Sequence, residues 1–350
     1  MAQLLDLLPE PVIAAAIGAF GGILLGLAAR LGRFCSLGAI EDALYGGQGK
    51  RLGQWGIAIG VAILGSGALI AGGLFDPRAS FYLSEPFSPV VVLFGALIFG
   101  YGMALAGTCG FGALARAGGG DIRAMVIALF LGIAALVTVS GPLAPLRVMA
   151  VEATAVRLPD GGLAGAMALF GVPLPMTFAL AGLLFIAAAC ASGALRRDPR
   201  ALFWAGVAGL SVVSAWAGTA WLAREGFAGL PVVSHTFSAP PGDAILWLMT
   251  ASGGGLSFGV GSVAGVVAGA VLASLGQGRF RWEACEDPRE LRRQIIGACL
   301  MGMGAVLALG CTIGQGLSAM SILAWSAPLA VAGIVIGAVA GLRQLIEGRI

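Results

Sequence analysis

A glycine–cysteine pattern occurs twice in this chain, at a constant separation of 202 residues. Cys109-x-x-Gly112 recurs as Cys311-x-x-Gly314. The same offset carries further residues onto identical or chemically similar ones: Gly100 onto Gly302, Gly102 onto Gly304, Ser36 onto Ser238 and Glu41 onto Asp243. A duplicated chain whose apolar segments are interrupted at corresponding positions is typical of transporters that bind their substrate between two repeats.

Long apolar segments make up most of the chain. Hydrophobic residues account for 59% of its 350 residues and charged residues for only 11%, and the mean hydropathy is +0.97. A soluble domain of this size carries about 25% charged residues. The sequence therefore predicts an all-α integral membrane protein. The acidic Asp6 and Glu10 near the start argue against a cleavable signal peptide.

Nine segments are long and apolar enough to cross a bilayer as helices, for which about 20 residues are needed. We expect these spans at residues 12–31, 52–74, 88–106, 123–141, 163–190, 200–223, 252–276, 293–309 and 323–344. Four further apolar segments are too short to span, and they lie at residues 36–46, 110–118, 240–249 and 312–320. We interpret them as re-entrant half-helices, because non-helical backbone at membrane depth must be buried in protein or line a polar cavity.

The offset divides the chain into two repeats. Residues 1–143 hold four spans and two half-helices, residues 144–199 form a connector with the central span, and residues 200–350 repeat the first pattern. The single connecting span predicts that the second repeat is inverted, with two vestibules and a narrow waist between them. Of the 20 Lys and Arg residues, sixteen fall on the side of the C-terminus and four on the other. This bias places the N-terminus outside and the C-terminus in the cytoplasm.

The waist is where the chemistry is expected. Half-helices after Cys35 and Cys109 enter from the cytoplasm and the one after Cys311 enters from outside, so their tips should meet. A helix N-terminus binds anions through unpaired N–H groups and partial positive charge. A thiol adds a soft sulfur and a weak donor, which suits brief binding of a sulfur-rich anion. Beside the three cysteines, we expect contacts from Gly107, Thr108, Gly110, Gly310, Thr312, Gly314 and Gln315.

Other polar residues allow two interpretations each. Glu41 and Asp243 occupy equivalent places on two half-helices, where they serve either as a proton or gating site or as wet surface groups. His235 is the only histidine and is expected to order its loop, with a pH switch or a metal ligand as the minority interpretation. Cys190 and Cys299 lie within apolar helices and are expected to act as small hydrophobic residues.

At the cysteine motifs the sequence resembles the YeeE/YedE sulfur-transport family, which includes bacterial thiosulfate importers. The motifs are Arg33-Phe34-Cys35, Gly107-Thr108-Cys109-Gly110, residues 310–316 and residues 281–286, and the resemblance covers about residues 18–345. It implies an hourglass-shaped protein of the bacterial inner membrane. It also implies that Cys35, Cys109 and Cys311 contact thiosulfate, or a related inorganic sulfur anion, in succession through transient thiol hydrogen bonds.

The resemblance further implies a small cytoplasmic sulfur-carrier protein as a partner. Cys285 lies in the arginine-rich cytoplasmic loop, where it is either a solvated thiol or part of a docking site for such a partner. The sequence contains no P-loop, so ATP-driven transport by this chain alone is not expected. We expect a transporter that is not an enzyme, with no cofactor, no bound metal and no nucleic-acid partner.

Two rival functions remain open at this point. In the first, the three cysteines form a membrane thiol relay that passes sulfur or electrons covalently, although the chain has no C-x-x-C pair. In the second, the cysteines and His235 assemble a metal site. The trapping of a mixed disulfide or persulfide would favour the relay, and metal analysis would test the second rival.

Overall fold

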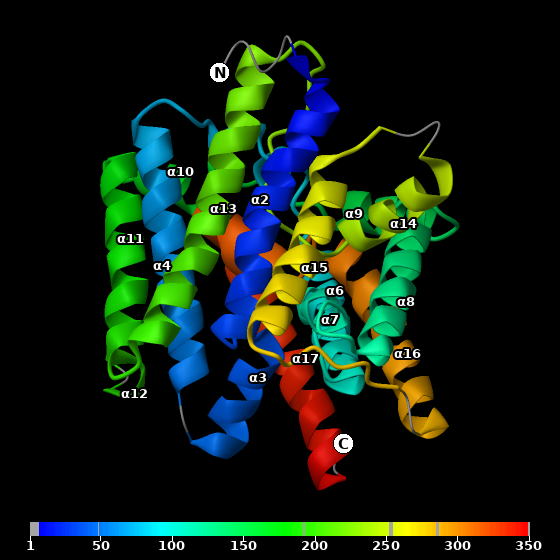
Figure 1. The fold of residues 1–350 in the computed structure, drawn as a ribbon. Helices are drawn as coiled ribbons and strands as arrows, with labels where there is room; N and C mark the ends of the chain where they lie inside the picture. The colour runs from blue at the N-terminus through cyan, green and yellow to red at the C-terminus, as the bar shows by residue number, and fades with distance from the viewer. Residues whose placement is uncertain (1–6, 48, 192, 252–254, 285–286, 349–350) are drawn as a thin grey trace.

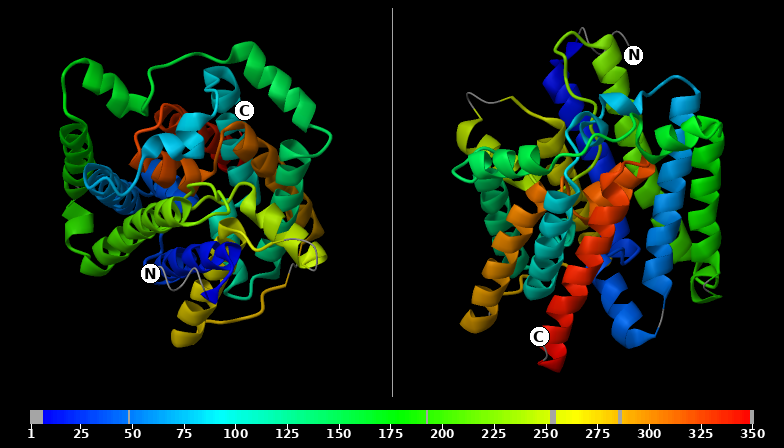
Figure 2. Two further views of the ribbon diagram at one scale, coloured as in Figure 1. Left: turned by 90° about the horizontal axis from the view of Figure 1, so that it is seen from above. Right: turned by 180° about the vertical axis from the view of Figure 1, so that it is seen from behind.

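The computed structural model describes residues 7–47, 49–191, 193–251, 255–284 and 287–348 as a bundle of helices (Figure 1). Within these residues the regular secondary structure is helical, and β-structure is limited to isolated bridges. The axes of the longest helices are roughly aligned, with some helices running one way and some the other. The two termini lie at opposite ends of the molecule (Figures 1 and 2). The all-α fold class predicted from the sequence is therefore confirmed.

The helices follow one another along the chain with short connections. Their bounds are α2 (Glu10–Leu31), α3 (Ser36–Glu41), η1 (Asp42–Gly46), α4 (Lys50–Ala71), η2 (Pro77–Ala79), α5 (Phe81–Ser84), α6 (Pro89–Ala106), α7 (Gly110–Ala117), α8 (Ile122–Val139), α9 (Ala144–Thr154), α10 (Gly162–Leu169), α11 (Leu174–Cys190), α12 (Gly193–Arg196), α13 (Pro199–Glu225), α14 (Pro240–Thr250), α15 (Phe258–Gly276), α16 (Pro288–Leu307), η3 (Gly314–Ala319) and α17 (Ser326–Glu347).

Seven helical segments among the described residues are long and apolar enough to cross a bilayer. They are Glu10–Gly46, Lys50–Ala71, Pro89–Ala117, Ile122–Val139, Pro199–Glu225, Phe258–Gly276 and Ser326–Glu347. The other two expected spans correspond to α11, which has 17 residues, and α16, whose first turns carry several charged side chains. The fold is that of a multi-pass membrane protein, with seven rather than nine segments that meet this standard.

The single span predicted at residues 163–190 is wrong in detail. The structure divides it into α10 and α11, which are separated by Phe170–Pro173. Gly171 adopts a left-handed conformation with φ of 82°, and Pro173 lacks the N–H that a continuing helix needs. Helix α9, within the predicted connector, had no counterpart in the sequence-based expectation.

Short helices occupy the four segments that were too short to span. Helix α3 with η1 covers residues 36–46, α7 covers 110–117, α14 covers 240–250, and the π-helical turn η3 covers 314–319. Three of them follow a loop that contains a cysteine, namely Cys35, Cys109 or Cys311. The loop before α14 contains Phe237 instead.

The 202-residue offset relates whole helices as well as single residues. It carries α2 onto α13, α3 onto α14, α4 onto α15, α6 onto α16, α7 onto η3 and α8 onto α17. The helix contacts show the same correspondence. Helix α2 packs along α15, and their counterparts α13 and α4 pack along each other. Likewise, α6 packs along α17, and their counterparts α16 and α8 pack along each other. In Figure 1, α2 runs from the N-terminal end of the molecule toward the other end, and α13 runs the opposite way.

Glycines bring α2 and α15 into backbone contact. Gly18 and Gly22 of α2 lie against the backbone of α15, so that a Cβ on either would overlap a carbonyl oxygen there. Gly261 and Gly265 of α15 face α2 in the same way. This spacing of small residues lets membrane helices approach closely, and dispersion contacts then replace a hydrophobic driving force. The two helices are therefore held in direct backbone contact along several turns.

Candidate functional site

Cys109 caps the helix that follows it. Helix α6 ends at Gly107, whose φ of 72° turns the chain, and Cys109 then takes an extended conformation at the N-cap of α7. Its Sγ accepts a hydrogen bond from the backbone N–H of Gly112 at 3.3 Å, and the residue is only 1% exposed. The sulfur therefore lies over the positive end of α7.

Cys311 occupies the equivalent position in the second half of the chain. Leu309, which corresponds to Gly107, also has a positive φ of 58°. The Sγ of Cys311 accepts N–H bonds from Phe237 at 3.2 Å and from Gly314 at 3.5 Å. The hydroxyl of Thr236 lies 3.9 Å from the same sulfur. Two chain segments 74 residues apart thus converge on one thiol.

Cys35 is less enclosed than the other two cysteines. It stands at the N-cap of α3 without a capping hydrogen bond and is half-buried. Its neighbour Ser36 donates to the Oγ1 of Thr312 at 3.5 Å, which joins the start of α3 to the segment after Cys311. Cys109 lies close enough to Cys35 and to Cys311 to interact electrostatically with both. The structure therefore gathers the three predicted cysteines at one place.

Two phenylalanines close the space beside the thiols. The rings of Phe111 and Phe237 lie 5.5 Å apart between centroids, and both side chains are almost completely buried. Gly110 permits this approach, because a Cβ there would stand 2.9 Å from the carbonyl oxygen of Phe237. Phe237, which corresponds to Cys35 by the offset, is thus part of an apolar wall.

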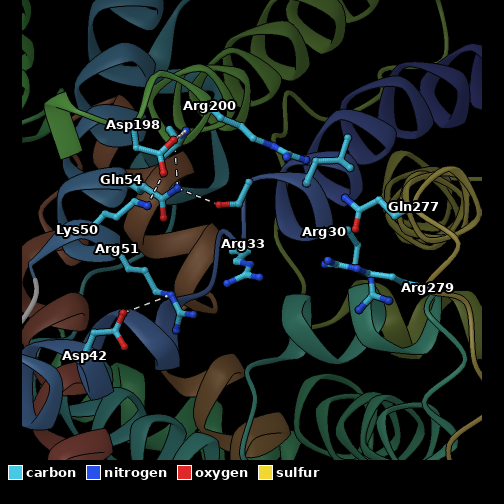
Figure 3. A pocket seen from close by; sticks show the side chains of 13 residues that line it. Arg30, Arg33, Asp42, Lys50, Arg51, Gln54, Asp198, Arg200, Gln277 and Arg279 are labelled. Carbon is cyan, nitrogen blue, oxygen red and sulfur yellow. Dashed lines mark hydrogen bonds and ion pairs between the residues drawn. The ribbon is translucent and has the colours of Figure 1, made fainter. Parts of the chain in front are cut away.

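Two cavities approach the cysteine cluster. One, of about 610 Å³, is lined by Tyr82, Trp216, Thr236, Ser238 and Asp243 among others, and through Thr236 it reaches the Cys311 sulfur. The other, of about 700 Å³, is strongly polar and includes Arg33, two residues before Cys35 (Figure 3). One cavity therefore reaches the Cys311 sulfur, and the other is lined by a residue of the loop that carries Cys35.

The remaining predicted contact residues are distributed over these loops. Gln315 is fully buried, and its amide is used internally: it donates to the carbonyl of Ala308 at 2.7 Å and accepts from Ser326 at 3.1 Å. Thr108 is buried, and its hydroxyl donates to the carbonyl of its own neighbour Cys109 at 3.3 Å. Gly310 has an extended φ of 157°.

The acids and the histidine lie at different depths. Glu41 is exposed at the end of α3, whereas Asp243 is half-buried and lines the smaller cavity. His235 is fully buried, with its Nδ1 2.7 Å from the hydroxyl of Ser262. Its carbonyl accepts a hydrogen bond from Ser318 at 2.7 Å, so this histidine anchors its loop as the sequence suggested.

Several residues of this region were not among the contacts expected from the sequence. Thr236 and Ser238 flank Phe237, and the correspondence of Phe237 with Cys35 was a signal that could have found them. Tyr82 comes from the connection between α4 and α6 and lies beside Gly314. No pattern in the sequence points to it.

The other cysteines are separate from this cluster. Cys190 and Cys299 are half-buried within α11 and α16, and Cys285 lies outside the described residues. Throughout the part of the chain that the structure describes, no three His, Cys, Asp or Glu side chains gather in a way that suits a metal ion. The rival site built from cysteines and His235 has no geometric support among those residues.

Long apolar helices that pack in pairs, together with short helices that begin at cysteines, define a multi-pass membrane protein. The chain belongs to the sulphur transport family, whose model matches residues 31–340. It is 27% identical over 330 residues to the thiosulfate transporter TsuA of Escherichia coli (strain K12), covering 91% of each chain. It is 26% identical over 340 residues to the thiosulfate transporter TsuA of Spirochaeta thermophila, covering 91% of this chain and 96% of that relative.

Proposed function

We propose that this protein takes up thiosulfate, or a closely related inorganic sulfur anion, across the bacterial inner membrane. The anion enters through the smaller cavity, passes Cys311, Cys109 and Cys35 by brief contacts, and leaves through the larger one. The observation that carries this proposal is the convergence of backbone N–H groups on the sulfurs of Cys109 and Cys311. The named function of both relatives supports the choice of substrate.

The sulfurs of Cys109 and Cys311 accept the backbone N–H bonds that a bound anion would accept in their place. Each of these two sulfurs accepts a backbone N–H bond at the start of a helix, which is where a negatively charged group is most stable. A passing anion competes for these N–H groups and receives a weak S–H hydrogen bond in return. The contacts have to be brief, because a tightly bound ion would not leave. Thr108, Thr312 and Gln315 shape the loops that present these groups.

The four short helices serve as re-entrant half-helices of two inverted repeats. The matched helices and matched contacts described above support this arrangement, as does the opposite course of α2 and α13. In such transporters the substrate site lies near the bilayer midplane, where the half-helices of both repeats meet. The hydrogen bond between Ser36 and Thr312 is a contact of this kind.

The C-terminal end of the molecule faces the cytoplasm and the N-terminus faces the periplasm. The larger cavity, at the ends of α2 and α15 and the starts of α4 and α13, carries most of its charge as arginine and lysine. Such residues are enriched on the cytoplasmic side of membrane proteins. A small cytoplasmic sulfur-carrier protein would receive the substrate at this cavity. Separately, Glu41 and Asp243 would couple proton movement or gating to transport.

Radiolabelled thiosulfate uptake into liposomes that hold the pure protein tests this function. We expect uptake to be lost when Cys35, Cys109 or Cys311 is changed singly to alanine, and to persist in Cys190→Ala, the matched control. Sulfate and sulfide serve as competitors. Undiminished uptake in all three alanine variants would refute the assignment.

Serine variants separate brief hydrogen bonding from a covalent thiol relay. Serine keeps a donor at each position but cannot form a sulfur–sulfur bond. Partial uptake by Cys109→Ser and Cys311→Ser, above that of the alanine variants, is expected for hydrogen bonding. Equal loss in both sets, with a persulfide trapped on the wild-type protein during turnover, would instead establish the relay.

A further inference from the structure

The larger cavity is unusual in its charge. Its volume is about 700 Å³, and its lining includes six cationic side chains: Arg30, Arg33, Lys50, Arg51, Arg200 and Arg279. Two acidic side chains, Asp42 and Asp198, share it. Figure 3 shows these side chains around one space between the ends of several helices. A cavity with such an excess of positive charge strongly favours an anionic occupant.

Only two of the six cations have an acidic partner among the described residues. Lys50 pairs with Asp198, and Arg51 pairs with Asp42 at 3.3 Å. Arg30 uses its Nε to donate to the hydroxyl of Ser274 at 2.9 Å. By contrast, no hydrogen bond or ion pair of a side chain is found for Arg33, Arg200 and Arg279 within the described residues. Their guanidinium groups therefore keep their full capacity to bind an oxyanion in a bidentate manner.

Arg33 stands in a backbone conformation that favours glycine. Its φ is 54°, just beyond the end of α2, where the N–H of Phe34 bonds back to the carbonyl of Ala28 at 3.3 Å. The buried amide of Gln54 secures this turn by donating to the carbonyl of Gly32 at 2.9 Å. A left-handed backbone conformation is strained for a residue other than glycine. An arginine here, where glycine is the usual choice, indicates that its side chain is used.

The smaller cavity has the opposite character. Its charged lining consists of Glu85, Asp243 and a single cation, Arg147, and the rest is largely apolar. The two cavities therefore differ in their attraction for an anion, and the cationic one is lined by Arg33, two residues before Cys35. This asymmetry would make an anion more stable on the side of Arg33.

We infer that the basic cavity is a second anion-binding site, distinct from the thiols, that holds a free inorganic dianion of tetrahedral shape such as thiosulfate or sulfate. Its role as the exit site rests on the proposed function, whereas its ability to bind does not. The site cannot drive net transport, because a fixed charge leaves the overall gradient unchanged. The site stabilises the anion once it has passed Cys35, so the anion spends less time at the thiols. Sulfate on the same side of the membrane competes for the same arginine side chains.

Calorimetric titration of the detergent-solubilised protein with sodium sulfate and sodium thiosulfate tests the site directly. The protein should carry Cys35→Ala, Cys109→Ala and Cys311→Ala, so that binding at the thiols is removed. We expect one saturable dianion site to remain, with affinity that falls as ionic strength rises. Absence of saturable binding in this variant would overturn the inference. Uptake is not measured, so a failure of the transport proposal would not alter this result.

Two sets of arginine substitutions locate the bound anion. Arg33→Gln, Arg200→Gln and Arg279→Gln together should weaken dianion binding about tenfold or more, as expected from the loss of three nearby charges. Arg292→Gln, Arg293→Gln and Arg343→Gln together remove the same charge outside the cavity and should have little effect. An equal loss in both sets would overturn the inference, because general surface charge would then explain the binding.

Arg33→Gly separates binding from a merely structural role. Glycine relieves the strained backbone, so thermal stability should be kept or raised while dianion affinity falls. A parallel fall of stability and affinity would contradict the inference. Titration with short-chain phosphatidylglycerol distinguishes a lipid head group from a free anion, and binding of the lipid without binding of sulfate would also overturn it.

Discussion

At the scale of single residues, the site depends on close approach of backbone to sulfur. Gly314 is the clearest case, because its N–H points to Cys311 and its Cα faces a polar pocket. A Cβ at this position would stand 2.5 Å from Thr236 Oγ1 and 3.0 Å from the hydroxyl of Tyr82. Neither oxygen belongs to a long flexible side chain that could move away freely.

We expect Gly314→Ala to reduce thiosulfate uptake about tenfold while the protein still folds. Overpacking of this kind costs about 1–2 kcal/mol, and about 1.4 kcal/mol corresponds to a tenfold change. Gly206→Ala on α13 is the matched control, since no atom lies within 4 Å of its new Cβ. Similar uptake in both variants, measured in proteoliposomes, would show that the pocket beside Cys311 is not on the route.

The sequence indicated where the helices of this region begin, but not how their side chains meet. The repeated Cys-x-x-Gly spacing indicated helix starts at Cys109 and Cys311, and the structure has them there. It could not indicate that each sulfur would cap its own helix, because that depends on a side-chain rotamer. Nor could it reveal Tyr82, which reaches Gly314 only after distant helices have packed.

At the scale of helices, glycine contacts set how closely the elements pack. Helices α2 and α15 touch through their backbones along Gly18, Gly22, Gly261 and Gly265. Close packing of this kind leaves no room for a methyl group, so these positions tolerate change less than their apolar surroundings would suggest.

Gly265→Ala should lower the thermal stability of the protein in detergent. Its Cβ would overlap the carbonyl oxygen of Ala19, and the helices must separate at a cost of about 1–3 kcal/mol. Gly276→Ala, at the end of the same helix, meets no atom within 4 Å and should leave the unfolding temperature unchanged. Equal unfolding temperatures for the two variants would mean that this interface contributes little.

An ion pair joins the starts of two helices, α4 and α13. The ammonium of Lys50, hydrogen-bonded to the carboxylate, holds the pKa of Asp198 below its ordinary value, and the N–H of Ala201 adds to this. A depressed pKa contributes stability above the unfolded value of about 3.9, and this stability is lost as pH falls through the folded value.

Asp198→Asn should therefore lower the unfolding temperature slightly at pH 7. The difference from the wild type should narrow as the pH is lowered through about 4. The effect should be below about 1 kcal/mol, because both side chains are about one third exposed. Thermal unfolding of both proteins across this pH range measures it, and a gap that widens in acid would show that the pair has no such role.

At the scale of the whole molecule, the proposed uptake of a dianion would run against the membrane potential. The free energy of a dianion rises by about 4.6 kcal/mol per 100 mV when it enters a negative-inside cell, from about 2.3 kcal/mol per charge. The basic cavity lowers the energy of the anion locally but cannot alter this total. Net uptake therefore requires rapid consumption of the substrate or a coupled cation.

Uptake into proteoliposomes should respond to an imposed potential. If the anion moves alone, an inside-positive potential set by a potassium gradient and valinomycin accelerates thiosulfate entry, and an inside-negative one suppresses it. Control liposomes without protein report any leak. A rate that does not change with potential would reveal electroneutral coupling, and a proton or sodium gradient then identifies the partner ion.

The sequence by itself determined that this is a helical membrane protein with a duplicated chain and thiols at breaks in the helices. Those properties follow from local composition and spacing, which act through hydrophobicity and helix termination. Only the tertiary structure decided that the hydroxyl of Ser36 donates to Thr312 and that the N–H of Phe237 donates to the sulfur of Cys311. It also decided that six cationic side chains line one cavity. Each of these joins residues far apart in the chain, and their meeting depends on how helices pack, which no local pattern encodes.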